Sequence, residues 1–207
     1  VRSAFAPVDW VSVKIDAPDE GLWRRIDRPV RAFSFSDHLA ALTAFRDEFS
    51  GIFATETMLV DGVNTDAATV DSIAEIVDSL APDVAYLSIP TRPPAESWAL
   101  PPSEEDVLAA YRVFVAHGVT TELNVTHEEG DFVAAGADEE DADLAESIRA
   151  ITAVHPMRED DLAALLQRSG VATAFLDELV EREALLKREY RGETFYVTPL
   201  KKRRSRR

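Results

Sequence analysis

IFATETMLVDGVNTDAATVDSIAEIVDSLAPDVAYLSI, residues 52–89, holds two apolar runs on either side of an amphipathic stretch. The runs Ile52–Val60 and Val84–Ile89 predict strands, and Pro90 stops the second. After the turn pair Asp61-Gly62, with Thr65 or Asn64 as the expected cap, apolar residues recur at helical spacing: Val70, Ile73, Val77 and Leu80. Strand, helix and strand in this order indicate a right-handed βαβ unit and a parallel sheet.

The same alternation continues on both sides of this stretch. Upstream, Trp10–Asp16 alternates as a strand and Ser36–Phe49 follows as a helix capped by Ser36. Downstream, a Ser103 capping box opens a helix that Gly118 closes, and Thr120–Thr126 is the fourth strand. Four strands are too few to close a barrel. We therefore expect an α/β fold, a partial (open) parallel βα barrel whose edge strand is covered by another chain or by upstream residues.

The remaining sequence predicts three more segments. Residues 128–143 carry eight acids and form an acidic linker after the barrel part, residues 1–127. Residues 144–199 have the order of a small winged-helix (α+β) domain, and residues 200–207 form a basic tail. The elements expected in the small domain are helices over Leu144–Val154, Arg158–Arg168 and Val171–Glu183, then strands over Leu185–Tyr190 and Thr194–Thr198.

Composition narrows the functional classes. The 207 residues carry a formal net charge of -16, and lysine is rare, so broad phosphate binding is disfavoured and a halophilic cytoplasm is favoured. No cysteine is present, which excludes disulfides, thiolate zinc sites and cysteine-ligated iron–sulfur clusters within this chain. With no apolar run near the roughly 20 residues of a membrane span, and no signal-peptide pattern, we expect a cytoplasmic protein without membrane contacts.

Polar residues occupy one face of the predicted strands. In the first strand Ser12, Lys14 and Asp16 alternate with apolar residues, and Glu56 lies in the second strand. Burying a lysine and carboxylates inside a barrel costs free energy unless these groups are paired with one another or bind a ligand. Two interpretations remain open: a ligand site at the carboxyl ends of the strands, where barrel sites lie, or a structural ion pair on an edge strand.

The loop after the third strand adds further candidates. Ser88 lies near the end of that strand, and Thr91 and Arg92 follow between prolines. An arginine just past a strand end suits a carboxylate or phosphate ligand, although a loop salt bridge is the commoner explanation for a lone arginine. The four histidines, among them His127, show no metal-ligand spacing, and no phosphate loop or catalytic triad is present.

Four segments in this order carry a resemblance to a known family. SVKIDAPDEGLWRRIDRP (Ser12–Pro29) resembles the segment of radical S-adenosylmethionine (radical SAM) enzymes in which a strand ending in Asp-Ala leads to a Phe-Arg-x-Ile-Asn-Arg-Pro-like stretch. TETMLVDGVNTD (Thr55–Asp66) resembles their next strand and turn, with Asp61 in place of the usual proline. AYLSIPTRPPAESW (Ala85–Trp98) and ITAVHPMREDDL (Ile151–Leu162) resemble the sixth strand and the winged module of archaeal radical SAM proteins related to wyosine-type tRNA-modifying enzymes.

The resemblance implies an iron–sulfur oxidoreductase that uses SAM and a 4Fe–4S cluster held on a CxxxCxxC loop. In that picture Ser12, Lys14, Asp16 and Glu56 face the cofactor, while three residues border a small-molecule or RNA substrate: Ser88, Thr91 and Arg92. The CxxxCxxC loop and the Gly-rich strand of the family are absent from this sequence. We therefore expect no catalytic or metal-binding residue here, no tight cofactor binding and no turnover by this chain alone, with a partner N-terminal half supplying the cluster.

A second hypothesis is a non-catalytic nucleic-acid-binding or scaffold protein acting through the winged helix and the basic tail. The predicted third helix, Val171–Glu183, carries four acids against the single base Arg182, which opposes contact with phosphates. We expect weak, non-specific nucleic-acid binding through Lys201–Arg207 at most.

Overall fold

The computed structural model describes residues 8–124 and 141–199 and divides the chain into two compact units, Val1–Thr126 and His127–Arg207. His127, most of the expected acidic linker and the basic tail lie outside the described residues. Within the described ranges, no helix combines the length and apolar character that crossing a bilayer requires.

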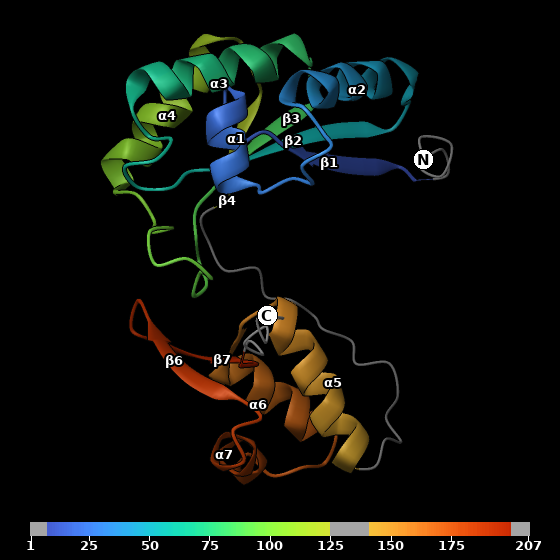
Figure 1. Cartoon of the computed structure of the whole chain (residues 1–207), viewed down its shortest axis with the longest axis vertical. Helices are drawn as coiled ribbons and strands as arrows, with labels where there is room; N and C mark the ends of the chain where they lie inside the picture. Colours follow the sequence, from blue (N-terminus) through green and yellow to red (C-terminus); the bar gives the residue numbers. More distant parts are fainter. Residues whose placement is uncertain (1–7, 125–140, 200–207) are drawn as a thin grey trace, which may run out of the picture. The chain divides into compact units, whose positions relative to one another are not determined.

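The first unit is built on a four-stranded parallel sheet. The strands β1 (Trp10–Lys14), β2 (Ile52–Met58), β3 (Val84–Ser88) and β4 (Thr121–Asn124) lie side by side in that order. The sheet is open, with β1 at one edge and β4 at the other, as the count of four strands predicts (Figure 1). This is the arrangement of a partial βα barrel.

Three of the helices cover one face of this sheet: α2 (Phe35–Glu48), α3 (Ala67–Ser79) and α4 (Glu104–Ala116) (Figure 1). Their apolar stripes pack against every second strand residue, which gives one continuous core. Its most buried members include Ile15, Phe53, Ile73, Val77, Leu87 and Phe114. Because side chains alternate along a strand, the intervening residues project from the opposite face.

Local details differ from the sequence expectations at two helix starts. Ser103 caps α4 as predicted, accepting a hydrogen bond from the Asp106 backbone N–H. The cap of α2 is Ser34 and not Ser36, and that of α3 is Asp66 and not Thr65 or Asn64. Asn64 does not cap the helix because its side chain is hydrogen-bonded to the backbone at the ends of the first two strands. A short helix that the sequence did not predict, α1 (Glu20–Ile26), buries Trp23.

The second unit contains, in chain order, α5 (Asp141–Val154), β5 (Met157–Arg158), α6 (Glu159–Arg168), α7 (Ala174–Glu181), β6 (Leu186–Tyr190) and β7 (Glu193–Val197). The strands form an antiparallel sheet in the order β5-β7-β6. Arg191 and Gly192, with φ of 53° and 81°, form the two-residue turn between β6 and β7. The end of the expected linker is helical because α5 begins at Asp141, and α7 is shorter than the predicted third helix.

Candidate functional site

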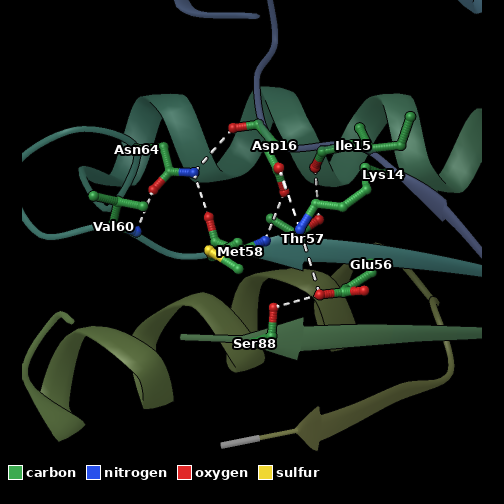
Figure 2. A network of polar contacts seen from close by, with 9 residues as sticks. All are labelled: Lys14, Ile15, Asp16, Glu56, Thr57, Met58, Val60, Asn64 and Ser88. Carbon is green, nitrogen blue, oxygen red and sulfur yellow. Dashed lines mark hydrogen bonds and ion pairs between the residues drawn. The ribbon is translucent and has the colours of Figure 1, made fainter. Parts of the chain in front are cut away.

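A polar cluster lies on the sheet face opposite the helices (Figure 2). Lys14 of β1 extends across to Glu56 of β2, with 3.3 Å between Nζ and Oε1. Ser88 of β3 donates a hydrogen bond to the same oxygen at 2.9 Å. Lys14 and Glu56 are 41% and 32% exposed, so both can be reached from solvent. Three neighbouring strands thus present an ammonium, a carboxylate and a hydroxyl to one surface.

Asp16 extends this cluster below the surface. Its side chain is only 2% exposed; Oδ1 accepts a hydrogen bond of 2.7 Å from the Met58 backbone N–H, and Oδ2 lies 3.4 Å from Lys14 Nζ. Burial raises the pKa of Asp16 to about 7; Lys14 opposes this shift, and the neighbouring Asp27 adds to it. The carboxyl group is therefore close to half-protonated near neutral pH.

Asn64 fixes the ends of the strands that carry the cluster. Its side chain is fully buried. Its Nδ2 donates to the carbonyl oxygens of Asp16 and Met58 at 2.9 Å each, and its Oδ1 accepts from the Val60 N–H at 2.7 Å (Figure 2). The sequence indicates Asn64 only as a helix cap. Its position just after the Asp61-Gly62 turn was the available sign that it closes that turn.

Two further residues near the cluster were not predicted. Asp27, at the C-terminal end of α1, has its side chain hydrogen-bonded to that of Asp16, and burial raises the pKa of Asp27. His38 of α2 stacks on Trp23 with 5.2 Å between ring centroids, and burial lowers the pKa of His38. Asp27 lies within the Trp-Arg-Arg-Ile-Asp-Arg-Pro run, but nothing in the sequence indicates that its side chain contacts that of Asp16.

The structure brings together four of the residues that the sequence singled out: Lys14, Asp16, Glu56 and Ser88. Ser12 lies on the same face of β1, two residues before Lys14, opposite Ala54 in the register. Thr91 and Arg92 lie in the partly buried loop that follows β3.

Metal ligation has little support within the described part of the chain. Residues 8–124 and 141–199 contain no group of three or more histidine, aspartate or glutamate side chains placed to hold a metal ion. The sequence contains no cysteine, so no thiolate of this chain can hold a cluster. The polar cluster consists of one ammonium, two carboxyl groups and one hydroxyl.

Comparisons with known proteins agree with this architecture. No family model matches the chain. A UPF0026 protein of Methanocaldococcus jannaschii is 34% identical over 206 residues, which are 98% of this chain and 62% of that protein. A UPF0026 protein of Synechocystis is 31% identical over 97 residues, 45% of this chain and 34% of that protein. The chain therefore spans less than two thirds of the length of these curated relatives.

One solved structure has a similar fold. The crystal structure of a radical SAM methyltransferase from Sphaerobacter thermophilus superposes with a TM-score of 0.52 at 21% identity, covering 61% of this chain and 37% of that enzyme. A likeness at this identity concerns the fold and not the chemistry. The matched part of this chain accordingly shares its fold with part of that enzyme, a parallel βα arrangement.

Proposed function

We propose that this chain is the C-terminal portion of a radical SAM protein and that its polar sheet face contacts SAM and the substrate. The observation that carries the proposal is the cluster of Lys14, Asp16, Glu56 and Ser88 on the face of a partial parallel sheet opposite α2, α3 and α4. Such a face is the interior of a barrel when further strands complete it, and ligands of barrel enzymes bind there near the carboxyl ends of the strands.

The residues of the cluster fit SAM. The cofactor carries an ammonium and a sulfonium, both positive, and a carboxylate; the cluster offers carboxylate oxygens and an ammonium within one surface. Glu56 uses Oε1 for both Lys14 and Ser88, and Figure 2 shows Oε2 directed away from these contacts. Glu56 would bind a ribose hydroxyl or the ammonium of the cofactor, and Lys14, paired with Asp16 and Glu56, would hold Glu56 in place. The chemistry that SAM supplies in such enzymes is hydrogen abstraction from the substrate.

The 4Fe–4S cluster does not fit this chain, because the sequence provides no thiolate. A cluster that serves this site would be held by residues outside these 207. The longer UPF0026 relatives are compatible with such an arrangement, since a large share of each lies beyond the aligned region. Under this proposal the chain contributes cofactor and substrate contacts and is inactive alone.

For the second unit we propose a winged-helix-like module. The order α5, β5, α6, α7, β6, β7, with a two-residue turn in the hairpin, supports this assignment. Its role is packing or substrate positioning. The helix α7, which would enter the major groove in a DNA-reading module, presents only carboxylates as charged groups: Asp177, Glu178 and Glu181. This acidity disfavours the alternative of a nucleic-acid reader.

Equilibrium dialysis with labelled SAM tests the proposed function. We expect weak binding by the full chain and a loss of about tenfold in affinity for Glu56→Gln, the value of one charge-assisted contact. Glu75→Gln, on the exposed side of α3, is the matched control and should bind as the unmodified chain does. Equal affinities of both variants would contradict a role for this sheet face.

A further inference from the structure

A pocket of about 540 Å³ lies beside the buried end of the polar cluster, between α1, the loop after it and α2. This volume suits a small ligand. Aromatic and aliphatic side chains make most of its wall, and four ionisable groups also line it; the members that matter here are Lys14, Trp23, Asp27, Phe33, Asp37 and His38. Neither the cluster on the sheet face nor the comparisons assign a ligand to it.

Two of the four ionisable groups around the pocket already have charged or hydrogen-bonding partners. Lys14 is paired with Asp16 and Glu56, and the side chain of Asp37 accepts a hydrogen bond from the Ser34 hydroxyl at the start of α2. Asp27 differs. Among the described residues its Oδ2 is buried without a donor, and its neighbour is the carboxyl group of Asp16.

The carboxyl groups of buried Asp16 and half-buried Asp27 lie in contact and cannot both ionise cheaply, because like charges repel strongly where little water reaches them. A single proton held between Asp16 and Asp27 satisfies both groups. The charged and titratable groups that face this pair are Lys14 on β1, His38 on α2 and, through Lys14, Glu56 on β2. Since Lys14 is neutralised by its partners, this end of the pocket lacks a free positive charge and offers a carboxyl oxygen.

The rest of the pocket favours a cation with an apolar body. Trp23 is buried and holds the ring of His38 in a stack, and Phe33 is 60% exposed at the pocket. Aromatic faces and carboxylates together are the groups that bind organic ammonium ions in proteins. An anionic ligand would instead meet Asp27 and Asp37, while Lys14 is already paired with carboxylates and burial lowers the pKa of His38.

We propose that this pocket binds a small organic ammonium ion, with its nitrogen at Asp27 and its apolar part against Trp23 and Phe33. On binding, the shared proton leaves Asp16 and Asp27 for the solvent, and an N–H of the ammonium takes its place between the two carboxylates. The inference goes beyond the proposed function, and its test measures binding in the absence of SAM, so either can fail without the other.

Calorimetric titration of the full chain with phenethylamine tests it. In two buffers of different ionisation enthalpy at about pH 6, we expect release of close to one proton per amine bound, and no release at about pH 9, where the pair is already ionised. Phenylpropionate and phenylethanol, which share the ring but lack the ammonium, should bind at least about tenfold more weakly.

Three variants separate this proposal from its alternatives. Asp27→Asn is isosteric and supplies an amide donor to Asp16, so it should abolish proton release and weaken amine binding about tenfold. Asp47→Asn, exposed on α2, removes the same charge away from the pocket and should change neither. His38→Gln should retain the release, which excludes the imidazole as its source. Amine binding without proton release, or unchanged binding by Asp27→Asn, would overturn the proposal.

Discussion

Replacing Asn64 by alanine should destabilise the first unit strongly, because one fully buried side chain joins three backbone groups. The change leaves the Val60 N–H and the carbonyl oxygens of Asp16 and Met58 without their side-chain partner. Each buried polar group that loses its partner costs about 1–3 kcal/mol, so we expect a loss of about 4 kcal/mol in the free energy of unfolding. The carbonyl groups lie at strand ends, and partial access to water keeps the total below the simple sum.

Urea unfolding monitored by tryptophan fluorescence measures this loss. All three tryptophans, Trp10, Trp23 and Trp98, belong to the first unit, so the signal reports that unit alone. With a slope of about 2 kcal/mol per molar urea, the midpoint should fall by about 2 M. Asn124→Ala, the same change on edge strand β4, should cost less than about 1 kcal/mol. A loss below about 1 kcal/mol for Asn64→Ala would refute the role assigned to Asn64.

The stability of the first unit should fall as pH rises from about 4 to about 7, because folded Asp16, with its pKa raised by burial to about 7, retains a proton that the unfolded chain releases. The loss in the free energy of unfolding is at most roughly 4 kcal/mol, at about 1.4 kcal/mol per pKa unit. Urea unfolding of Asp16→Asn at several pH values should lack this pH dependence, and an unchanged dependence would contradict the assignment to Asp16. Ser103→Ala should lower the free energy of unfolding by about 1 kcal/mol, because it removes the cap of α4. No measurable loss would show that the cap does not contribute to stability. Deleting Lys201–Arg207 should abolish weak, salt-sensitive nucleic-acid binding in a filter assay, whereas sequence-specific binding that survives both deletion and high salt would show that the second unit reads DNA. Anaerobic incubation with iron and sulfide should leave the chain colourless, and stoichiometric iron retained after desalting would be the contrary result.

The parallel sheet could be predicted from sequence because its determinants are local. The apolar runs of β2 and β3 flank a helix with a continuous apolar stripe, and Val70, Ile73 and Val77 all lie in the core. The contact between Lys14 and Glu56 also follows from local rules, since a period of two along each strand and a parallel register place both on one face. Strand alternation therefore predicted the centre of the polar cluster.

The buried part of the site consists of contacts between residues far apart in the sequence, such as Asp27 and Asn64 with Asp16. These contacts could not be predicted from the sequence. The helix α1 has seven residues and buries only Trp23, so its amphipathic pattern is too short to recognise. Asp27 follows this helix and reaches Asp16 only because α1 folds back toward the end of β1. The sequence suggests Asn64 as a helix cap. In the structure its side chain instead bonds the backbone of Asp16 and Met58, and these contacts depend on how the two strands lie side by side.

The central claim is that the polar sheet face of the first unit, opposite α2, α3 and α4, contacts SAM. The most direct measurement is a titration of the isotope-labelled full chain with SAM, followed by amide chemical shifts. We predict that the shifted amides concentrate at Lys14, Glu56 and Ser88 and their strand neighbours, and that residues 141–199 remain unchanged. Shifts confined to residues 141–199, or no shifts at millimolar SAM, would contradict the account.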